Sequence, residues 1–397
     1  MPSPRRFFLI RASGDLRFFV RVACLCYSLA CVFESPSVSA ADAEWVGAKV
    51  MLKETAKPKL GTQALDWSAV RLPAKVTQAK DGWLWVGTAW VRPSDVVPLA
   101  DAPAYFTALL NSGRSKVLAY ALRGVSWYAL REYDNAIKDF SQAIMLEPGD
   151  SSLFALRGKA LFMKHLYDAA LADFTEAIRL DPTNLVAYND RGCTLKNQGE
   201  YHAAERQFNE VLRMAPNNAL AFANRGALWF AQDDLDKAMT DLNRSIQLDP
   251  KQSFAYSNRG RVYMKRGDYP EAMADYDKAV AIDPDDWSAY NGRARIMATA
   301  PDFEFHLRDG KQAVEVATKT CEMSAWSEWI CVATLAAAYA EAGDFEAAVK
   351  WQKKAMQMSQ PAEEKEQRDN EHRLRLYEAG KPFYEEVKLV EERKDDE

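Results

Sequence analysis

The chain has 397 residues, of which 48% are hydrophobic, and its formal net charge is −5. This length suits about two or three structural units, and the hydrophobic share allows a large buried core. The acidic balance, with no basic stripe and no recognition motif, argues against a nucleic-acid-binding protein.

The first 40 residues have the pattern of an export signal. Five arginines precede Val22 to Phe33, an apolar run that is too short to span a bilayer. Val38-Ser39-Ala40 then fits a cleavage site of small residues. We therefore expect residues 1–40 to be a cleaved signal peptide, which leaves no transmembrane segment, and the mature chain to reach the periplasm or cell envelope of a bacterium. Lipidation at Cys31 and an uncleaved anchor remain as alternatives.

Residues 41–100 predict a small all-β module. Trp45 to Leu52 and Val70 to Val76 suggest two strands, and apolar residues that alternate around a Gly turn from Gly82 to Val91 indicate a hairpin. Pro93 to Val97 then predicts one tight helical turn that leads to a last short strand.

This order of elements resembles the bacterial SH3-like barrel. Bacterial SH3-like modules often bind peptide or cell-wall material, and the resemblance permits the same of this module. The alternative is that Trp83, Trp85 and Trp90 only fill and rim a barrel too small to do without large side chains.

Residues 101–116 predict a linking helix. Tyr105, Phe106 and Leu109 lie at helical spacing within it. We expect this helix to act as the second helix of a truncated repeat and to cap the array that follows.

Residues 117–286 consist of five consecutive copies of one 34-residue unit. A fixed period of this length predicts a solenoid of helical hairpins. Every copy has Gly at position 8 and Ala at position 20, so the paired helices can approach closely, and Pro at position 32, which ends the second helix. The copies start at Val117, Ser151, Leu185, Ala219 and Ser253.

Aromatic residues stand at position 4 of every copy, and at position 24 of every copy except the fourth, which has Leu242. Together with the Gly, Ala and Pro positions, these landmarks resemble the tetratricopeptide (TPR) repeat. The resemblance implies a superhelix whose concave surface binds protein or peptide partners. The predicted fold is therefore mostly α: a TPR α-solenoid preceded by a small all-β SH3-like barrel.

An arginine stands at position 7 of each copy, where the family usually has leucine. Position 23 is Asp in four of the five copies. We interpret these residues as ion pairs between neighbouring helices, because the acid repeats in step with the base. The alternative is an arginine ladder that binds anionic ligands. The arginines are Arg123, Arg157, Arg191, Arg225 and Arg259.

The repeat pattern changes after residue 286. Trp287 to Ala298 opens a sixth copy, the period breaks at Ala300-Pro301-Asp302, and helices are expected again over Gly310–Cys321 and from Thr334 to Met356. Residues 287–362 resemble the divergent C-terminal repeat pair of many exported bacterial TPR proteins. Residues 363–397 predict a solvent-facing capping helix and a charged tail.

Three cysteines follow the signal: Cys193, Cys321 and Cys331. Cys321 and Cys331 are ten residues apart, near the end of one predicted helix and the start of the next. In an exported protein they can form a disulfide; two free buried thiols are the alternative, and both interpretations stay open.

Known catalytic and cofactor motifs are missing from the sequence. It has no phosphate-binding loop, no dinucleotide-binding glycine motif and no nucleophile elbow, and no Cys/His grouping has the spacing of metal ligands. His306, in the segment that breaks the period, has no evident partner. We therefore expect neither an enzyme nor a protein that binds a metal or cofactor.

The TPR resemblance implies that the first helices line a concave groove through positions 2, 5, 9, 12 and 13. These positions change from apolar in the early copies to polar in the middle and basic in the last. Position 5 lacks the Lys that clamps a C-terminal carboxylate in the best-known TPR groove, so we expect an extended or helical peptide with acidic character at one end. The candidate groove residues are Tyr128, Phe162, Asn189, Lys196, Asn197, Phe254, Arg261, Lys265 and Arg295.

These features predict a scaffold of the bacterial envelope that binds protein or peptide partners through the TPR groove. The alternative is a cell-wall or glycan-binding protein led by the SH3-like module, with the repeats as a spacer.

Overall fold

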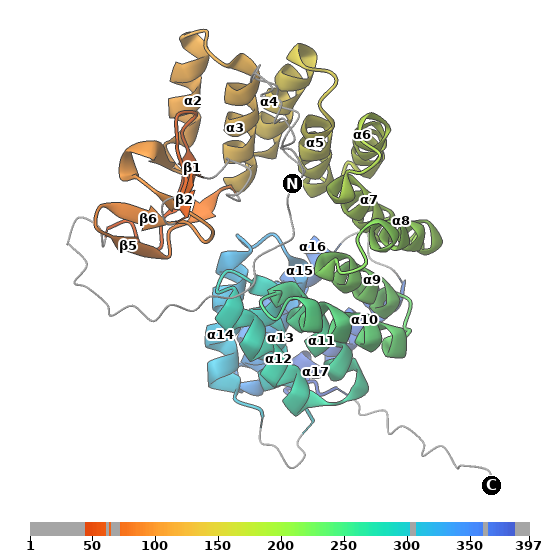
Figure 1. Cartoon of the computed structure of the whole chain (residues 1–397). Coiled ribbons are helices and arrows are strands. Elements are labelled where there is room, and N and C mark those ends of the chain that lie inside the picture. Colours follow the sequence, from red (N-terminus) through yellow and green to blue (C-terminus); the bar gives the residue numbers. More distant parts are fainter. Residues whose placement is uncertain (1–43, 61–62, 65–71, 302–306, 360–363, 386–397) are drawn as a thin grey trace, which may run out of the picture. The chain divides into compact units, whose positions relative to one another are not determined.

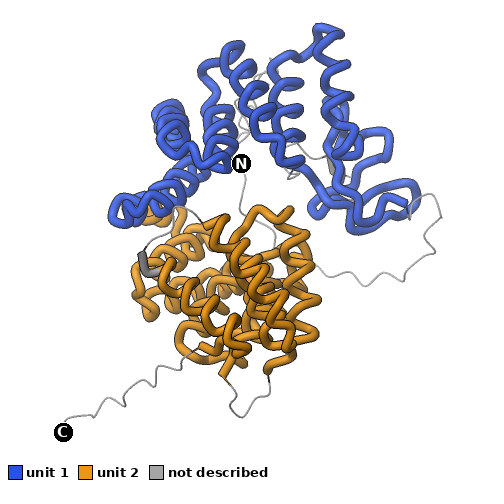
Figure 2. The backbone as a smooth tube through the Cα atoms, turned by 180° about the vertical axis from the view of Figure 1, so that it is seen from behind, with its two compact units in different colours: residues 1–207 blue, residues 208–397 orange. Residues whose placement is uncertain are grey.

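A computed structural model of the chain describes residues 44–60, 63–64, 72–301, 307–359 and 364–385. The chain divides into two compact units, residues 1–207 and residues 208–397 (Figure 2). The predicted signal peptide and His306 lie outside the described residues.

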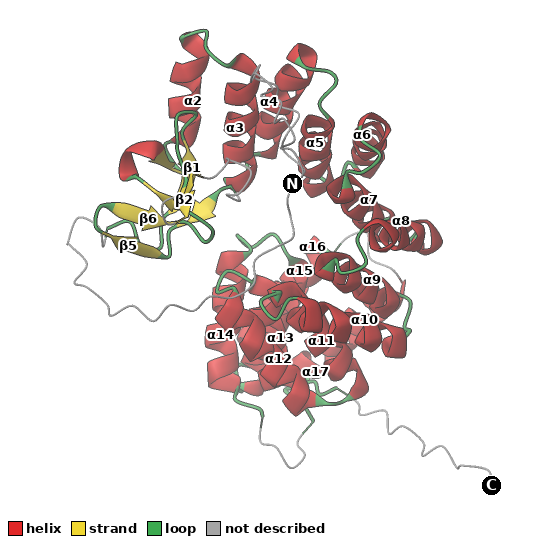
Figure 3. Ribbon diagram, viewed as in Figure 1, coloured by secondary structure: helices red, strands yellow, loops and turns green. Residues whose placement is uncertain are grey.

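The first unit opens with two small antiparallel sheets (Figure 3). One sheet has the strand order β4-β1-β8 and the other the order β3-β2-β7-β6-β5. The strands are β1 (Lys49–Leu52), β2 (Lys59–Leu60), β3 (Gln63–Ala64), β4 (Ala74–Lys75), β5 (Gln78–Lys80), β6 (Trp83–Trp85), β7 (Trp90–Val91) and β8 (Val96–Pro98), with the 3-10 turn η2 (Pro93–Asp95) between the last two.

The predicted hairpin is confirmed as β6 and β7, in which Trp85 pairs with Trp90. Leu84 is fully buried between the half-buried Trp83 and Trp85, as expected for a strand with one face on a core. The first strand begins at Lys49 and not at Trp45, because Trp45 accepts a hydrogen bond from the Ala48 N–H across a tight turn.

The remaining regular elements of the described chain are helices, which are joined by short loops (Figure 1). The first unit holds α2 (Ala102–Asn111), α3 (Lys116–Ala129), α4 (Tyr133–Leu146), α5 (Ser151–Met163), α6 (Tyr167–Leu180) and α7 (Leu185–Asn197), and α8 (Tyr201–Met214) runs across the boundary. The second unit holds α9 (Ala219–Ala231), α10 (Leu235–Leu248), α11 (Ser253–Arg266), α12 (Tyr269–Ile282), α13 (Trp287–Thr299), α14 (Gly310–Met323), α15 (Trp329–Glu341), α16 (Phe345–Met358) and α17 (Glu364–Glu378).

Within each copy, the two helices approach closely at the position 8 glycine. A Cβ atom added at Gly124 would lie 2.6 Å from the Phe140 ring, and one at Gly158 would lie 2.7 Å from Phe174. These aromatic side chains are fully buried. The glycine therefore leaves space for the position 24 side chain, as the repeat pattern predicts.

The position 7 arginines connect three helices in the same way along the array. In four copies the guanidinium forms a two-pronged pair with the position 23 aspartate of its own copy, at N–O distances of 2.7–2.8 Å. Its third nitrogen donates to the position 25 side chain of the preceding helix, at 2.6–3.3 Å in all five copies. The arginine also lies 5.6 Å from the position 4 aromatic ring. The ion-pair interpretation is thus confirmed.

Helix α2 takes the place of a second repeat helix before the first full copy. Ala102, Phe106 and Thr107 occupy the places of positions 20, 24 and 25, and Thr107 accepts a hydrogen bond from Arg123. The β-module fills the space of the missing first helix, since the buried Phe106 packs in one cluster with Met51, with Val97 of β8 and with Leu99. The expected capping role of this helix is therefore explained by its packing.

The C-terminal helices pack around a core rich in alanine, with α15 at its centre. Helix α15 begins at Trp329, five residues before the predicted Thr334, because it is apolar on all sides and has no period that marks its start. The predicted capping helix α17 is not wholly solvent-facing: Tyr377 is 1% exposed, and Asn370 accepts a hydrogen bond from Gln352.

Candidate functional site

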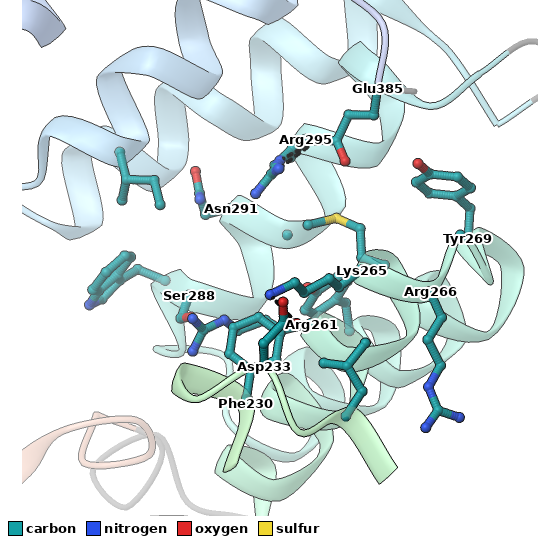
Figure 4. A pocket seen from close by; sticks show the side chains of 17 residues that line it. Phe230, Asp233, Arg261, Lys265, Arg266, Tyr269, Ser288, Asn291, Arg295 and Glu385 are labelled. Carbon is teal, nitrogen blue, oxygen red and sulfur yellow. Dashed lines mark hydrogen bonds and ion pairs between the residues drawn. The ribbon is translucent and has the colours of Figure 1, made fainter. Parts of the chain in front are cut away.

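A pocket of about 680 Å³ lies in the second unit (Figure 4). Its walls come mainly from the first helices of successive hairpins, α9, α11 and α13, which is where the TPR resemblance places the concave surface. The lining residues are Phe230, Asp233, Leu235, Arg261, Met264, Lys265, Arg266, Gly267, Tyr269, Tyr276, Trp287, Ser288, Asn291, Gly292, Arg295, Ile330 and Glu385.

Four basic side chains line this pocket, and three of them are paired with acids. Lys265 lies 2.7 Å from Asp233, and Arg295 lies 2.6 Å from Glu385. Arg266 pairs with Asp236 at 2.6 Å. These three ion pairs neutralise the positive charges of Lys265, Arg295 and Arg266 with acids of the same unit.

Arg261 differs from the other basic residues of the pocket. Its guanidinium donates to Asn258 Oδ1 at 3.1 Å and lies 4.5 Å from the centre of the Phe230 ring. None of the acids in the described part of the chain forms an ion pair with it. The Arg261 side chain is exposed to solvent, but desolvation by the protein atoms around the guanidinium lowers its pKa, and the positive charge of Arg295 acts in the same direction. A ligand carboxylate would favour the charged guanidinium and so oppose both effects.

Two buried polar atoms in the pocket wall have no hydrogen-bond partner among the described residues: Tyr276 Oη and Asn291 Oδ1. The side chains are 1% and 7% exposed. Burial raises the pKa of Tyr276, so its hydroxyl stays protonated and able to donate. Buried polar atoms are rarely left unpaired, and these two mark a place where a polar ligand group can bind.

Tyr276 reaches the pocket because the facing position is glycine. A Cβ atom added at Gly292 would lie 2.3 Å from Tyr276 Cζ, and one at Gly260 would lie 2.9 Å from the same ring. The ring is thus held between two glycines. At the place of Gly292, the preceding copy has Asn258.

The structure brings three of the predicted groove residues into this pocket: Arg261, Lys265 and Arg295. Phe254 lies on α11 and is 40% exposed, but does not line it.

The other five candidates belong to the first unit. Tyr128 packs against Tyr133 with ring centres 5.6 Å apart, and Phe162 packs against Tyr167 at 5.7 Å. The remaining three range from buried to exposed: Asn189 is buried, Lys196 is half-buried and Asn197 is exposed.

The sequence analysis missed several residues of the pocket. Asn291 stands at position 5 of the sixth copy, so the groove positions could have identified it. Tyr276 belongs to a second helix, and the pattern assigns its position to the core. Glu385 lies 90 residues from Arg295 along the chain, and no local signal links them.

Other predicted features have no role in this pocket. Cys321 and Cys331 are both buried and are free thiols in the structure, which agrees with the second of the two interpretations. In the ranges that the structure describes, no three metal-binding side chains gather, and none of the helices is long and apolar enough to cross a bilayer.

Family models of the tetratricopeptide repeat match residues 117–150, 189–253, 253–286 and 331–360. The helices form a TPR solenoid. No curated protein sequence matches the chain.

Solved TPR structures are similar to this chain in fold. A chain of the APC/C hetero-tetramer Cut9-Hcn1 has 15% identity and a TM-score of 0.50; the match covers 60% of this chain and 46% of that one. A TPR protein from Parabacteroides merdae has 19% identity and a TM-score of 0.46; the match covers 66% of this chain and 99% of that one. YrrB, a TPR protein with an unusual peptide-binding site, has 21% identity and a TM-score of 0.33; the match covers 46% of this chain and 95% of that one.

Proposed function

We propose that this TPR chain is a protein-interaction scaffold whose second unit binds an acidic segment of a partner protein. The observation that carries the proposal is Arg261, which lies in a basic pocket on the first helices and has no acidic partner there. A carboxylate that binds beside it also meets Tyr276 Oη, a free donor. Hydrogen bonds between charged groups are the strong ones in such sites.

Apolar side chains define the rest of the ligand. Phe230, Met264, Trp287 and Ile330 line the same pocket, and a volume of about 680 Å³ is within the range of ligand sites. The partner segment therefore carries at least one acidic side chain with apolar neighbours. The TPR fold also occurs in the Cut9-Hcn1 hetero-tetramer, which supports a protein as the partner.

A selection from a peptide library tests this function. The probe is a set of fluorescent heptapeptides with capped ends, in which Asp or Glu is placed among apolar residues, and a matched set has Asn or Gln instead. We expect the full chain to retain acidic members and to lose them as salt rises. Equal retention of acidic and amide members would contradict the proposal.

The envelope location remains a proposal that depends on residues 1–40. Their pattern of charge, apolar run and small residues supports cleavage after Ala40. We expect the protein isolated from its own cells to begin at Ala41. N-terminal sequencing checks this: an acylated Cys31 would support lipidation, and an intact Met1 in a membrane fraction would support an uncleaved anchor.

The SH3-like assignment of the β-module is also a proposal, supported by the hairpin, the turn η2 and the strand β8. Glycan binding receives no such support. Lys59 and Arg92 lie 5.2 Å and 5.1 Å from the ring centre of Trp83, and Trp85 packs against Trp90 with ring centres 5.3 Å apart, so contacts within the module already engage these three aromatic side chains.

A further inference from the structure

The segment that follows α17 returns to the pocket of the second unit. After Gly380, the chain runs through Phe383 and Tyr384 to Glu385. The Tyr384 ring lies 4.1 Å from the Arg308 guanidinium, and the Phe383 ring lies 4.8 Å from Arg373. Two arginines thus hold this segment in place.

Glu385 places a carboxylate inside the pocket (Figure 4). Its Oε1 accepts a hydrogen bond from Arg295 Nε at 2.6 Å, and Arg295 Nη2 lies 2.6 Å from the same oxygen. The Glu385 side chain is only 16% exposed. One backbone bond adds to this contact, from the Glu385 N–H to the Thr299 carbonyl at 2.9 Å.

A second arginine beside Glu385, Arg373, has a donor that forms no hydrogen bond with the described residues. Arg373 lines a small cavity of about 110 Å³ together with Arg295 and Glu385. Its Nε is buried and has no hydrogen-bond partner among the described residues. Burial lowers the pKa of Arg373, as does the nearby charge of Arg295. The small cavity beside the pocket therefore has more donors than one glutamate satisfies.

We propose that this unit has two carboxylate sites, one in the pocket at Arg261 and one where the pocket meets the small cavity, at Arg295 and Arg373, and that Glu385 fills the second site as an internal competitor of the partner. The inference rests on the proposed function and extends it. The partner segment would carry two acidic side chains. The first binds at Arg261 without displacing any acid, and the second must displace Glu385.

Charge gives the direction of the effect. Glu385 neutralises Arg295 and adds a negative charge to a pocket that must accept negative charges. Replacing its carboxylate by an amide of the same shape leaves the positive charge of Arg295 without a neutralising acid and removes the repulsion between Glu385 and the incoming carboxylate. We therefore expect Glu385→Gln to bind a doubly acidic segment more tightly, by about tenfold, within the usual range of such couplings.

The test is fluorescence anisotropy with the full chain and one defined probe. The probe is an end-capped heptapeptide with two glutamates separated by one phenylalanine, and its amide form has two glutamines. Glu385→Gln should lower the Kd for the acidic probe and leave the amide probe unchanged. Glu378→Gln, which removes a carboxylate paired with Lys353 on the exposed surface, is the matched control and should change neither.

Two further measurements tie the effect to Arg295. The double variant Glu385→Gln/Arg295→Gln should lose the gain in affinity. A synthetic pentapeptide with the sequence of residues 381–385 should displace the probe from Glu385→Gln. This competition is measured on the variant alone, so it remains informative if the variant is less stable than the wild-type chain.

The outcomes separate this inference from the proposed function. Binding of the acidic probe that is weakened by Arg261→Gln but unaffected, or weakened, by Glu385→Gln overturns the inference and leaves the proposed function standing. Binding to neither the wild-type chain nor Glu385→Gln overturns both. A gain that persists without Arg295 also overturns the inference.

Discussion

At the scale of single residues, the position 7 arginine makes the same contacts in every copy, yet its electrostatic environment differs in the third. Arg157 pairs with Asp173, and this hydrogen bond raises the pKa of the arginine. Arg191 meets the neutral Gln207 instead, at 2.6 Å and 3.1 Å, and burial lowers its pKa. The third copy therefore keeps the hydrogen bonds of the array without the charge of the acid.

Gln207→Asp should raise the free energy of unfolding. The aspartate adds the attraction of an ion pair to a hydrogen bond that already has a charged donor, and such pairs contribute up to about 1 kcal/mol, so we expect a gain of that order. The reciprocal variant Asp173→Gln gives the second copy the residue of the third and should lower stability by a similar amount. The midpoint of urea denaturation measures both. A loss of stability in Gln207→Asp would show that the third copy needs the longer side chain.

The large ring of Tyr276 occupies the space that Gly292 leaves because it has no side chain. A methyl group at Gly292 would overlap the ring, and overpacking of this kind costs about 1–3 kcal/mol. We therefore expect Gly292→Ala to lower the melting temperature. The equivalent positions of the preceding interface hold Leu242 and Asn258, so Tyr276→Leu/Gly292→Asn should recover much of the loss that Gly292→Asn causes alone. Calorimetry of the three variants decides whether the pair is coupled.

Residue patterns predicted the arginine–aspartate pairs because both members recur with the period of the repeat. The pattern could not predict Glu385, which occurs once and is separated from Arg295 along the chain by the helices α14 to α17. It also assigned Tyr276 only to the core, because the role of its hydroxyl depends on the glycine that faces it from the next copy.

At the scale of whole elements, the fixed period located the helical hairpins, while the irregular elements were harder to predict. The repeat fixes where each second helix ends through its Pro position. Helix α15 has no polar face, so its start could not be found from periodicity. The role of α2 depends on the β-module, which fills the space of a first helix with Met51 and β8.

Phe106→Ala should loosen the start of the array more than its later helices. The side chain is fully buried between α2, α3 and the β-module, and removing such a ring costs about 3–5 kcal/mol. In a solenoid each repeat contacts only its neighbours. We expect faster hydrogen exchange in α2 and α3 and little change in α6 and α7. Uniform acceleration across these helices would show that the first unit unfolds as a whole.

The helices α14 and α15 each bury one thiol. Burial raises the pKa of Cys321 to about 11 and that of Cys331 to about 12, from an ordinary value of 9.0. The folded chain holds these protons more strongly than the unfolded chain. Their contribution to stability is therefore complete below pH 9 and is lost as the pH rises through 11.

These thiols should react slowly in the folded protein. At pH 8 we expect a thiol reagent to modify neither Cys321 nor Cys331 until denaturant is added, after which both react. Peptide mapping by mass spectrometry reads each site separately. Rapid modification in the folded state would contradict the burial, and a cross-linked peptide that contains both residues would support the disulfide alternative.

At the scale of the whole molecule, the chain is described as two units, and the basic pocket lies within one of them. The sequence predicted a single groove that changes from apolar to basic across both. Three residues of its basic end line the pocket, because Arg261 and Lys265 on α11 and Arg295 on α13 follow the spacing of first helices. Which of these side chains retain a free charge depends on their acidic partners, and the repeat pattern does not reveal these.

The most direct test of the proposed function is the affinity of the full chain for the doubly acidic heptapeptide, with and without the Arg261 charge. Arg261→Gln removes the guanidinium, and Arg179→Gln, an exposed arginine paired with Glu176 outside the pocket, is the matched control. We predict that Arg261→Gln raises Kd by about tenfold, which corresponds to about 1.4 kcal/mol, while Arg179→Gln binds as the wild-type chain does. Equal Kd values for Arg261→Gln and the wild-type chain would contradict the account.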